Sequence, residues 1–164
     1  MGKKFTASQS QLRPDPVHND LILAKFINCI MYDGKKSVAQ RNMYDALEDI
    51  QGRLAKINDP AAPETALEVF HMAVEKVKPY VEVRSKRIGG ANYQVPMQVN
   101  RKRQQALAFR WIITAVRSEK GRPTHLKLAD ELWAAARGEG KAMTTRDQTH
   151  RMAEANKAFA HFAR

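Results

Sequence analysis

The spacing of the apolar residues changes in one region of this chain, and that change limits the folds open to it. From about residue 20 to 78, and again from 101 to 162, apolar side chains recur every three to four positions, as in helices with one buried face. Between 81 and 99 they alternate with polar residues, as in β-strands, and Gly89-Gly90 interrupts the alternation near its middle. The pattern therefore predicts a mainly α-helical protein with a single β-hairpin.

Six helices are predicted, three before the hairpin and three after it. Their approximate ranges are 20–34, 37–57, 63–78, 101–118, 124–137 and 144–162. Residue types that favour the start of a helix precede or open four of them: Asn19 or Asp20, the capping box Ser37 with Gln40, Pro63, and Thr144 or Thr145.

The length of 164 residues suits a single domain. We expect a flexible N-terminal arm over residues 1–17, which is polar and ends in a proline-rich turn. Residues 18–164 are expected to form one helical domain, from which a two-stranded antiparallel ribbon protrudes at about 80–100.

Two registers are open to the hairpin. A two-residue turn at Gly89-Gly90 pairs Val83 with Pro96 and mixes apolar and polar side chains on both faces. A three-residue loop pairs Val83 with Met97 and gives one apolar and one polar face. We expect the second register, because it separates the two kinds of side chain.

Basic residues are concentrated around the hairpin and the fourth predicted helix. Residues 78–123 contain eleven Lys and Arg but two Asp and Glu, a net charge of +9, whereas the whole chain carries +11. A solvated surface needs no such clustering, so the functional surface is expected here. The expected partners are polyanions, nucleic acid first and an anionic membrane surface second.

The cations best suited to phosphate lie before the second helix, on the hairpin and along the fourth helix: Lys35 and Lys36; Arg84, Lys86 and Arg87; Arg101, Lys102, Arg103, Arg110 and Arg117. Three cations in the first turn of a helix oppose its dipole, which favours an external anion at that end. Arg110 and Arg117 either extend this surface or cover the core with their aliphatic stems.

Other function classes lack their characteristic residues. We find no glycine-rich phosphate loop, catalytic constellation or metal-ligand spacing, so we expect no enzyme, no metal and no cofactor. The single cysteine, Cys29, cannot form an internal disulfide and is expected to be buried. No apolar stretch is long enough to span a membrane.

These observations leave two kinds of nucleic acid open. A helical domain with a basic, proline-containing ribbon can bend duplex DNA through the minor groove, and such a protein is expected to be a symmetric dimer. The same elements can hold a folded RNA junction by shape and phosphate contacts, for which a monomer is expected.

Several long motifs resemble one family. They are DLILAKFIN at 20–28, GKKS at 34–37, VEVRSKRIGGANYQVP at 81–96, ALAFRWII at 106–113 and HRMAEANKAFAH at 150–161. In this order and spacing they resemble the bacterial family of small-subunit ribosomal protein seven, over about residues 12–164. The six-helix layout with one ribbon is also the fold that this resemblance implies.

The resemblance implies direct binding to 16S ribosomal RNA (rRNA), nucleation of head assembly in the small subunit, and a place at the subunit interface near the decoding region. The implied rRNA-binding residues, with the cations of the arm and of the helix predicted at 101–118 included, are Lys3, Lys4, Lys35, Lys36, Arg84, Lys86, Arg101, Lys102, Arg103, Arg110, Arg117, Arg151, Asn156 and Lys157. The implied ribbon tip facing exit-site transfer RNA (tRNA) is Arg87, Ile88, Gly89, Gly90, Ala91, Asn92 and Tyr93. Small-subunit proteins nine and eleven are the implied neighbours, in a cytoplasmic ribosome or an organellar one.

Overall fold

The structure is a computed structural model that describes residues 12–57 and 63–163. Its elements are α1 (Leu21–Ile30), α2 (Lys36–Leu54), α3 (Ala66–Val77), β1 (Val81–Ile88), β2 (Ala91–Gln98), α4 (Arg101–Ser118), α5 (Thr124–Arg137), α6 (Lys141–Ala155) and the 3-10 helix η2 (Lys157–Ala163). The expected fold class is confirmed: six α-helices, with one antiparallel two-stranded sheet between α3 and α4.

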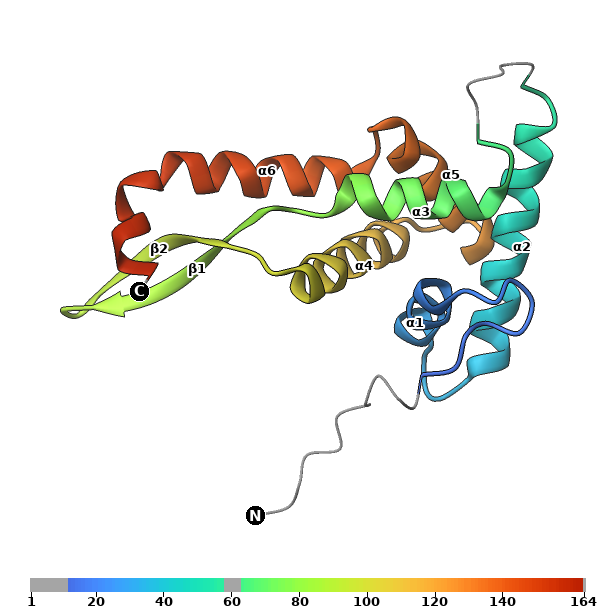
Figure 1. Cartoon of the computed structure of the whole chain (residues 1–164), viewed down its shortest axis with the longest axis horizontal. Helices are drawn as coiled ribbons and strands as arrows, with labels where there is room; N and C mark the ends of the chain where they lie inside the picture. The colour runs from blue at the N-terminus through green and yellow to red at the C-terminus, as the bar shows by residue number, and fades with distance from the viewer. Residues whose placement is uncertain (1–11, 58–62, 164) are drawn as a thin grey trace, which may run out of the picture.

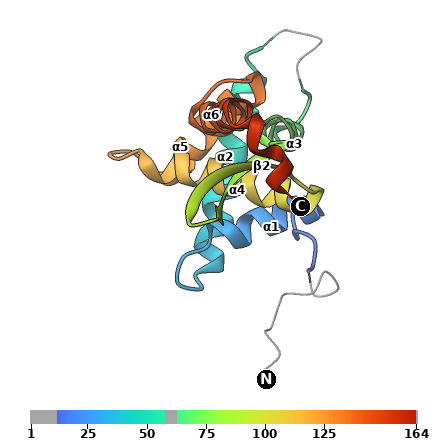
Figure 2. The ribbon, with the colours of Figure 1, turned by 90° about the vertical axis from the view of Figure 1, so that its left-hand side faces the viewer.

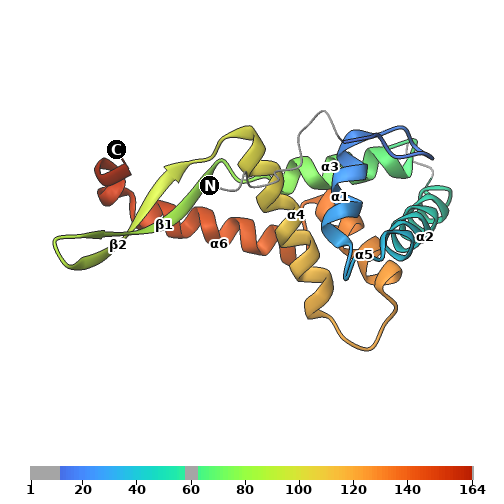
Figure 3. The same ribbon diagram turned by 90° about the horizontal axis from the view of Figure 1, so that it is seen from below.

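The ribbon formed by β1 and β2 projects from a helical body (Figure 1). Seen from below, α4 runs between the base of the ribbon and α1 (Figure 3). On the opposite side, α6 extends alongside the ribbon, and η2 turns down to meet it (Figures 1 and 2). One long side of α4 is therefore left without a covering helix.

Three phenylalanines join the helices at the centre of the core. The Phe26 ring centroid lies 5.3 Å from that of Phe70 and 5.1 Å from that of Phe109, so one side chain of α1 contacts both α3 and α4. The predicted apolar face of α2 is buried against the same core through Met43, Ile50 and their neighbours. Burial of such side chains stabilises the fold by about 1.5–3 kcal/mol each.

The predictions of both helix ends are right for α4 and α5, whereas at least one end differs in each of the other helices. Asp20 caps α1 as expected, accepting a hydrogen bond from the Leu23 N–H at 2.5 Å, but the helix ends at Ile30. The capping box of α2 is absent, because the helix already begins at Lys36. Thr65 caps α3 in place of the expected start at Pro63.

The start of α6 shows why local signals were insufficient. This helix begins at Lys141 and not at Thr144 or Thr145. The Ala142 N–H donates to the Glu131 carboxylate of α5 at 2.7 Å, so a side chain from the neighbouring helix satisfies a free N–H of the first turn. A cap supplied from another helix leaves no signal in the sequence around it.

The expected register of the ribbon is wrong. Val83 pairs with Pro96 and Arg84 with Val95, which is the register of the two-residue turn. Gly89 and Gly90 have φ angles of 56° and 89°, as a two-residue turn with two left-handed residues requires. Mixed faces are tolerated because the polar side chains of the ribbon find partners of their own, as described below.

Residues 12–17, at the end of the expected arm, contact the helical body. Asp15 is 3% exposed, and its carboxylate accepts hydrogen bonds from the Tyr44 hydroxyl at 2.7 Å and from the N–H groups of Val17 and His18. This anchor holds the segment across the start of α1. Cys29, expected to be buried, is exposed near the end of α1.

Candidate nucleic-acid interface

One side of α4 is open to solvent and carries cations. Its exposed residues recur every three to four positions and so share one side of the helix: Lys102, Ala106, Arg110, Thr114 and Arg117. We call these residues the α4 stripe. It extends about 22 Å at 1.5 Å per residue, and α4 contains no acidic residue.

The first turn of α4 concentrates positive charge at the base of the ribbon. The Asn100 side chain caps the helix by accepting from the Arg103 N–H at 2.9 Å. Arg101 and Lys102 are exposed and form no ion pair within the ranges that the structure describes. Because the helix dipole is also positive at this end, the site favours an external anion.

Glu82 organises two of the predicted RNA-binding arginines. Its side chain is 9% exposed and lies between Arg84 of the same strand and Arg103 of α4. The Arg84 Nε donates to it at 2.6 Å, and the Arg103 Nε donates at 3.1 Å. One buried carboxylate thus orients two partly exposed guanidinium groups, and the three side chains together keep a net positive charge.

Arg117 connects the far end of the α4 stripe to the turn between α1 and α2. Its guanidinium donates to the Ile30 carbonyl at 3.1 Å and lies 4.9 Å from the centroid of the Tyr32 ring. Lys35 and Lys36 follow in the same turn, and both are exposed. The expected cations of this turn and of α4 therefore belong to one side of the body.

The tip of the ribbon combines exposed backbone with a cation and an amide. Arg87, Gly89, Gly90, Ala91 and Asn92 are exposed, whereas Ile88 is half-buried. Tyr93 has a different environment, because its ring lies 5.2 Å from Phe159 and 5.4 Å from Phe162 of η2. Its packing braces the ribbon against the C-terminal segment.

The predicted residues of the last motif lie beside the ribbon rather than on α4. Arg151 is exposed near the C-terminal end of α6, and the Asn156 amide donates to the Met152 carbonyl at 2.8 Å as the helix ends. Lys157 is 3.4 Å from the Glu154 carboxylate, with both side chains 76% exposed. Lys86 donates to the Phe162 carbonyl at 2.8 Å, which ties β1 to η2.

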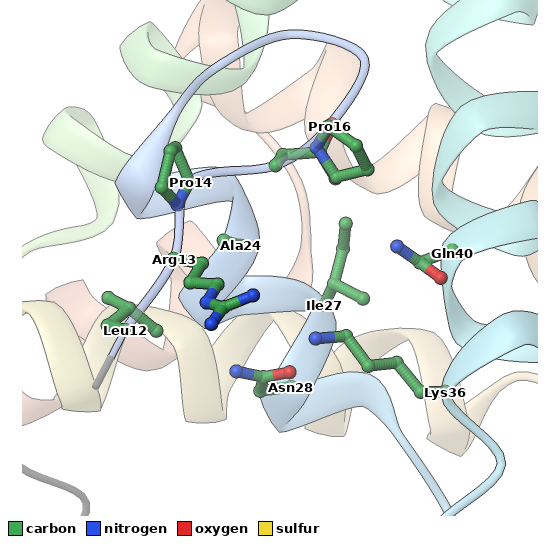
Figure 4. Close-up of a pocket in the computed structure, with 10 residues that line it drawn as sticks. Leu12, Arg13, Pro14, Pro16, Ala24, Ile27, Asn28, Lys36 and Gln40 are labelled. Atoms are coloured by element: carbon green, nitrogen blue, oxygen red, sulfur yellow. The ribbon is translucent and has the colours of Figure 1, made fainter.

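Three cations that bear on RNA binding belong to the N-terminal segment. Lys3 and Lys4 were predicted from the sequence, and Arg13 was missed. Lys3 and Lys4 lie outside the described residues. Arg13 was not selected from the sequence, yet it lies close to Lys36 across a surface hollow (Figure 4). The Asp15–Tyr44 contact, which joins residues 29 positions apart, helps to bring the two cations to one place.

Two arginines on the α2–α5 side of the body, Arg53 and Arg122, are bound to carboxylates. Arg53 lies 2.6 Å from both Asp49 and Asp130, and Arg122 lies 2.7 Å from Asp130. Burial alone would raise the pKa of Asp130, but the hydrogen bonds from both arginines hold it below its ordinary value. This network is internally neutralised, in contrast to the α4 stripe.

Metal and membrane features are absent from the part of the chain that the structure describes. No group of three or more His, Cys, Asp or Glu residues in 12–57 and 63–163 is arranged to hold a metal ion. No helix in these ranges has both the length and the apolar content required to cross a membrane.

A projecting basic ribbon joined to a cationic helix face that lacks acids defines a protein built to contact a polyanion over an extended surface. The family described as "Ribosomal protein S7p/S5e" matches residues 2–157. Three relatives bear the name small ribosomal subunit protein uS7. They come from Rhodopirellula baltica (61% identity over 98% of both chains), Thermotoga neapolitana (50% over 98% of both) and Rhodospirillum centenum (47% over 99% of both).

The chain therefore belongs to the S7p/S5e family of ribosomal proteins, and it is a structural component of the small ribosomal subunit. The family membership also confirms that the protein is not an enzyme.

Proposed function

We propose that this protein binds 16S rRNA directly and nucleates assembly of the head of the small subunit. The observation that carries the proposal is the α4 stripe, an exposed cationic surface about 22 Å long on a helix without acids. The first turn of α4 joins this surface to the base of the ribbon, and Arg117 joins it to the turn that holds Lys35 and Lys36.

The proposed mechanism is charge neutralisation where RNA helices converge. RNA helices repel one another through their phosphates, so a junction needs a cationic surface at its centre. The α4 stripe supplies cations, and Asn100, Glu82 and Arg103 hold the first turn of α4 and the ribbon in a defined relation. A preformed surface loses less side-chain entropy on binding than a flexible one does.

The ribbon is assigned a second contact. Its tip, from Arg87 to Tyr93, faces exit-site tRNA. The neighbouring proteins are small-subunit proteins nine and eleven, and the location is the ribosome of the cytoplasm. Exposure of Arg87, Asn92 and the two turn glycines supports a contact with RNA backbone at the tip. The packing of Tyr93 on η2 supports a stiff ribbon that keeps its direction.

Competition binding tests this function. The purified protein is titrated with a head-domain 16S rRNA junction against length-matched duplex RNA and duplex DNA, between 50 and 300 mM salt. We expect a monomer that prefers the junction, and the preference should persist at 200 mM salt. Equal and steeply salt-dependent binding to all three, by a symmetric dimer, would support the DNA-bending alternative and contradict the proposal.

A further inference from the structure

A surface hollow of about 400 Å³ lies between residues 12–16, α1 and the start of α2. Figure 4 shows Arg13, Lys36 and Asn28 extending toward one another at this hollow, each from a different segment of the chain. Its volume is in the range of pockets that hold one small ligand. We call it the Arg13–Lys36 pocket.

The pocket presents two cations and one carboxylate, a net positive charge. Arg13 and Lys36 are exposed, and neither forms an ion pair with another described residue. Asp15 also lines the pocket, but its two carboxylate oxygens accept hydrogen bonds from Tyr44 and from the N–H groups of Val17 and His18. Two like charges that face one space repel each other, and an incoming anion removes that repulsion.

The rest of the lining is mostly apolar, with two amides, Asn28 and Gln40. The apolar lining residues are Leu12, Pro14, Pro16, Ala24 and Ile27. Asn28, exposed on α1, adds an amide that can both donate and accept a hydrogen bond. A bare phosphate needs no apolar wall, whereas an unstacked nucleotide presents a phosphate, a flat apolar face and a hydrogen-bonding edge.

We propose that the Arg13–Lys36 pocket holds a single unpaired nucleotide of the bound rRNA. Arg13 and Lys36 bind its phosphate, the proline and aliphatic side chains contact the base, and the Asn28 amide bonds to the base edge. The inference rests on the proposed rRNA binding and adds a site that reads a base. The Asp15–Tyr44 hydrogen bond acts at a distance, by holding residues 12–16 in place as one wall.

Base-specific chemical probing of the rRNA junction, free and bound to the full-length protein, tests this site. Bound wild-type protein should protect one unpaired base from modification. Asn28→Ala should restore the reactivity of that base while leaving the salt dependence unchanged. Arg13→Gln and Lys36→Gln should each weaken binding about tenfold at 150 mM salt. Each should also lower the slope of log K against log salt by about one.

Arg41→Gln is the matched control, because Arg41 is an exposed cation of α2 that has no ion pair among the described residues and lies about 140° around the helix from Lys36. It should leave the protected base unchanged. Protection unchanged in all three pocket variants would overturn the inference. Weaker binding by the two cation variants, with no effect of Asn28→Ala on any base, would replace the nucleotide with a phosphate alone. If wild-type protein does not bind the junction at all, the proposed function itself is overturned.

Discussion

The Glu82 carboxylate of β1 lies 3.1 Å from the Arg103 Nε in the first turn of α4, and this contact joins the ribbon to the helix that follows it. Glu82 is also bonded to Arg84, so its charge is compensated twice. Since a buried carboxylate is costly without partners, the position of Glu82 holds both arginines near the ribbon base.

Replacing Glu82 should therefore loosen the base of the ribbon. We expect Glu82→Ala to lower the free energy of unfolding by about 1–2 kcal/mol. The value is modest because the Arg84 and Arg103 side chains are 54% and 38% exposed, so solvent screens them. Urea unfolding measures the change, and a double-mutant cycle with Arg103→Ala isolates the pair. A coupling energy of zero would show that the two side chains do not support each other.

The Tyr44 hydroxyl should anchor the segment before α1. Tyr44→Phe removes its hydrogen bond to Asp15, and we expect a loss of about 1–2 kcal/mol in the free energy of unfolding. Hydrogen exchange of the Val17 and His18 amides should become faster in the variant. Unchanged exchange at both amides would mean that the segment is held by other contacts.

Tyr44 should also make the stability of the fold depend on pH in the alkaline range. Burial and the hydrogen bond to Asp15 raise the pKa of Tyr44 from 10.0 to about 12. The fold thus favours the protonated phenol, and this stabilisation is complete below pH 10 and lost as the pH rises toward 12. Wild-type protein should lose more stability than Tyr44→Phe across that interval, and parallel losses would contradict the assignment.

His150 should make the fold less stable as the pH falls into the acidic range. Burial, with a contribution from Arg146, lowers the pKa of His150 below its ordinary 6.5, and its Nε2 is buried without a hydrogen-bond partner among the described residues. The neutral ring, 4.0 Å from the Tyr80 ring, is thus the form the fold favours. Its stabilisation is full above about pH 6.5 and is lost as the pH falls.

Thermal unfolding between pH 7 and pH 5 measures this effect. His150→Phe keeps a ring next to Tyr80 and removes the titrating group, so the variant should lose less stability over that interval than wild-type protein does. An equal loss in both proteins would assign the acid sensitivity to other groups.

Local signals were sufficient for some elements and insufficient for others. Gly138, in the left-handed conformation, ends α5 at the predicted position, because a helix breaker acts on neighbouring residues. The start of α6 depends on Glu131 of α5, whose side chain caps it. The ribbon register puts Glu82 on a mixed face, where it depends on Arg103 of α4 as a partner. Tertiary contacts of this kind leave no periodic pattern to detect.

The candidate interface also contains residues that the sequence predicts and one that it does not. The cations of α4 and the ribbon were found from clustered charge alone, and the structure places them on exposed surfaces of the ribbon and along α4. Arg13 was missed because it is a single cation in a polar segment, and the folded position of Asp15 helps to bring it to Lys36. Clustered charge in the sequence is enough to predict a basic surface. A pocket built from distant segments can be found only in the folded structure.

The most direct test of the central claim is the salt dependence of binding to the head-domain rRNA junction. The double variant Lys102→Gln/Arg110→Gln removes two cations of the α4 stripe, and Arg41→Gln/Lys56→Gln removes two exposed cations from α2 and its C-terminal end. None of the four forms an ion pair with a residue of 12–57 or 63–163. If the α4 stripe binds phosphate, the slope of log K against log salt should fall by about two in the first variant and stay at the wild-type value in the second. Equal slopes in all three proteins would contradict the account.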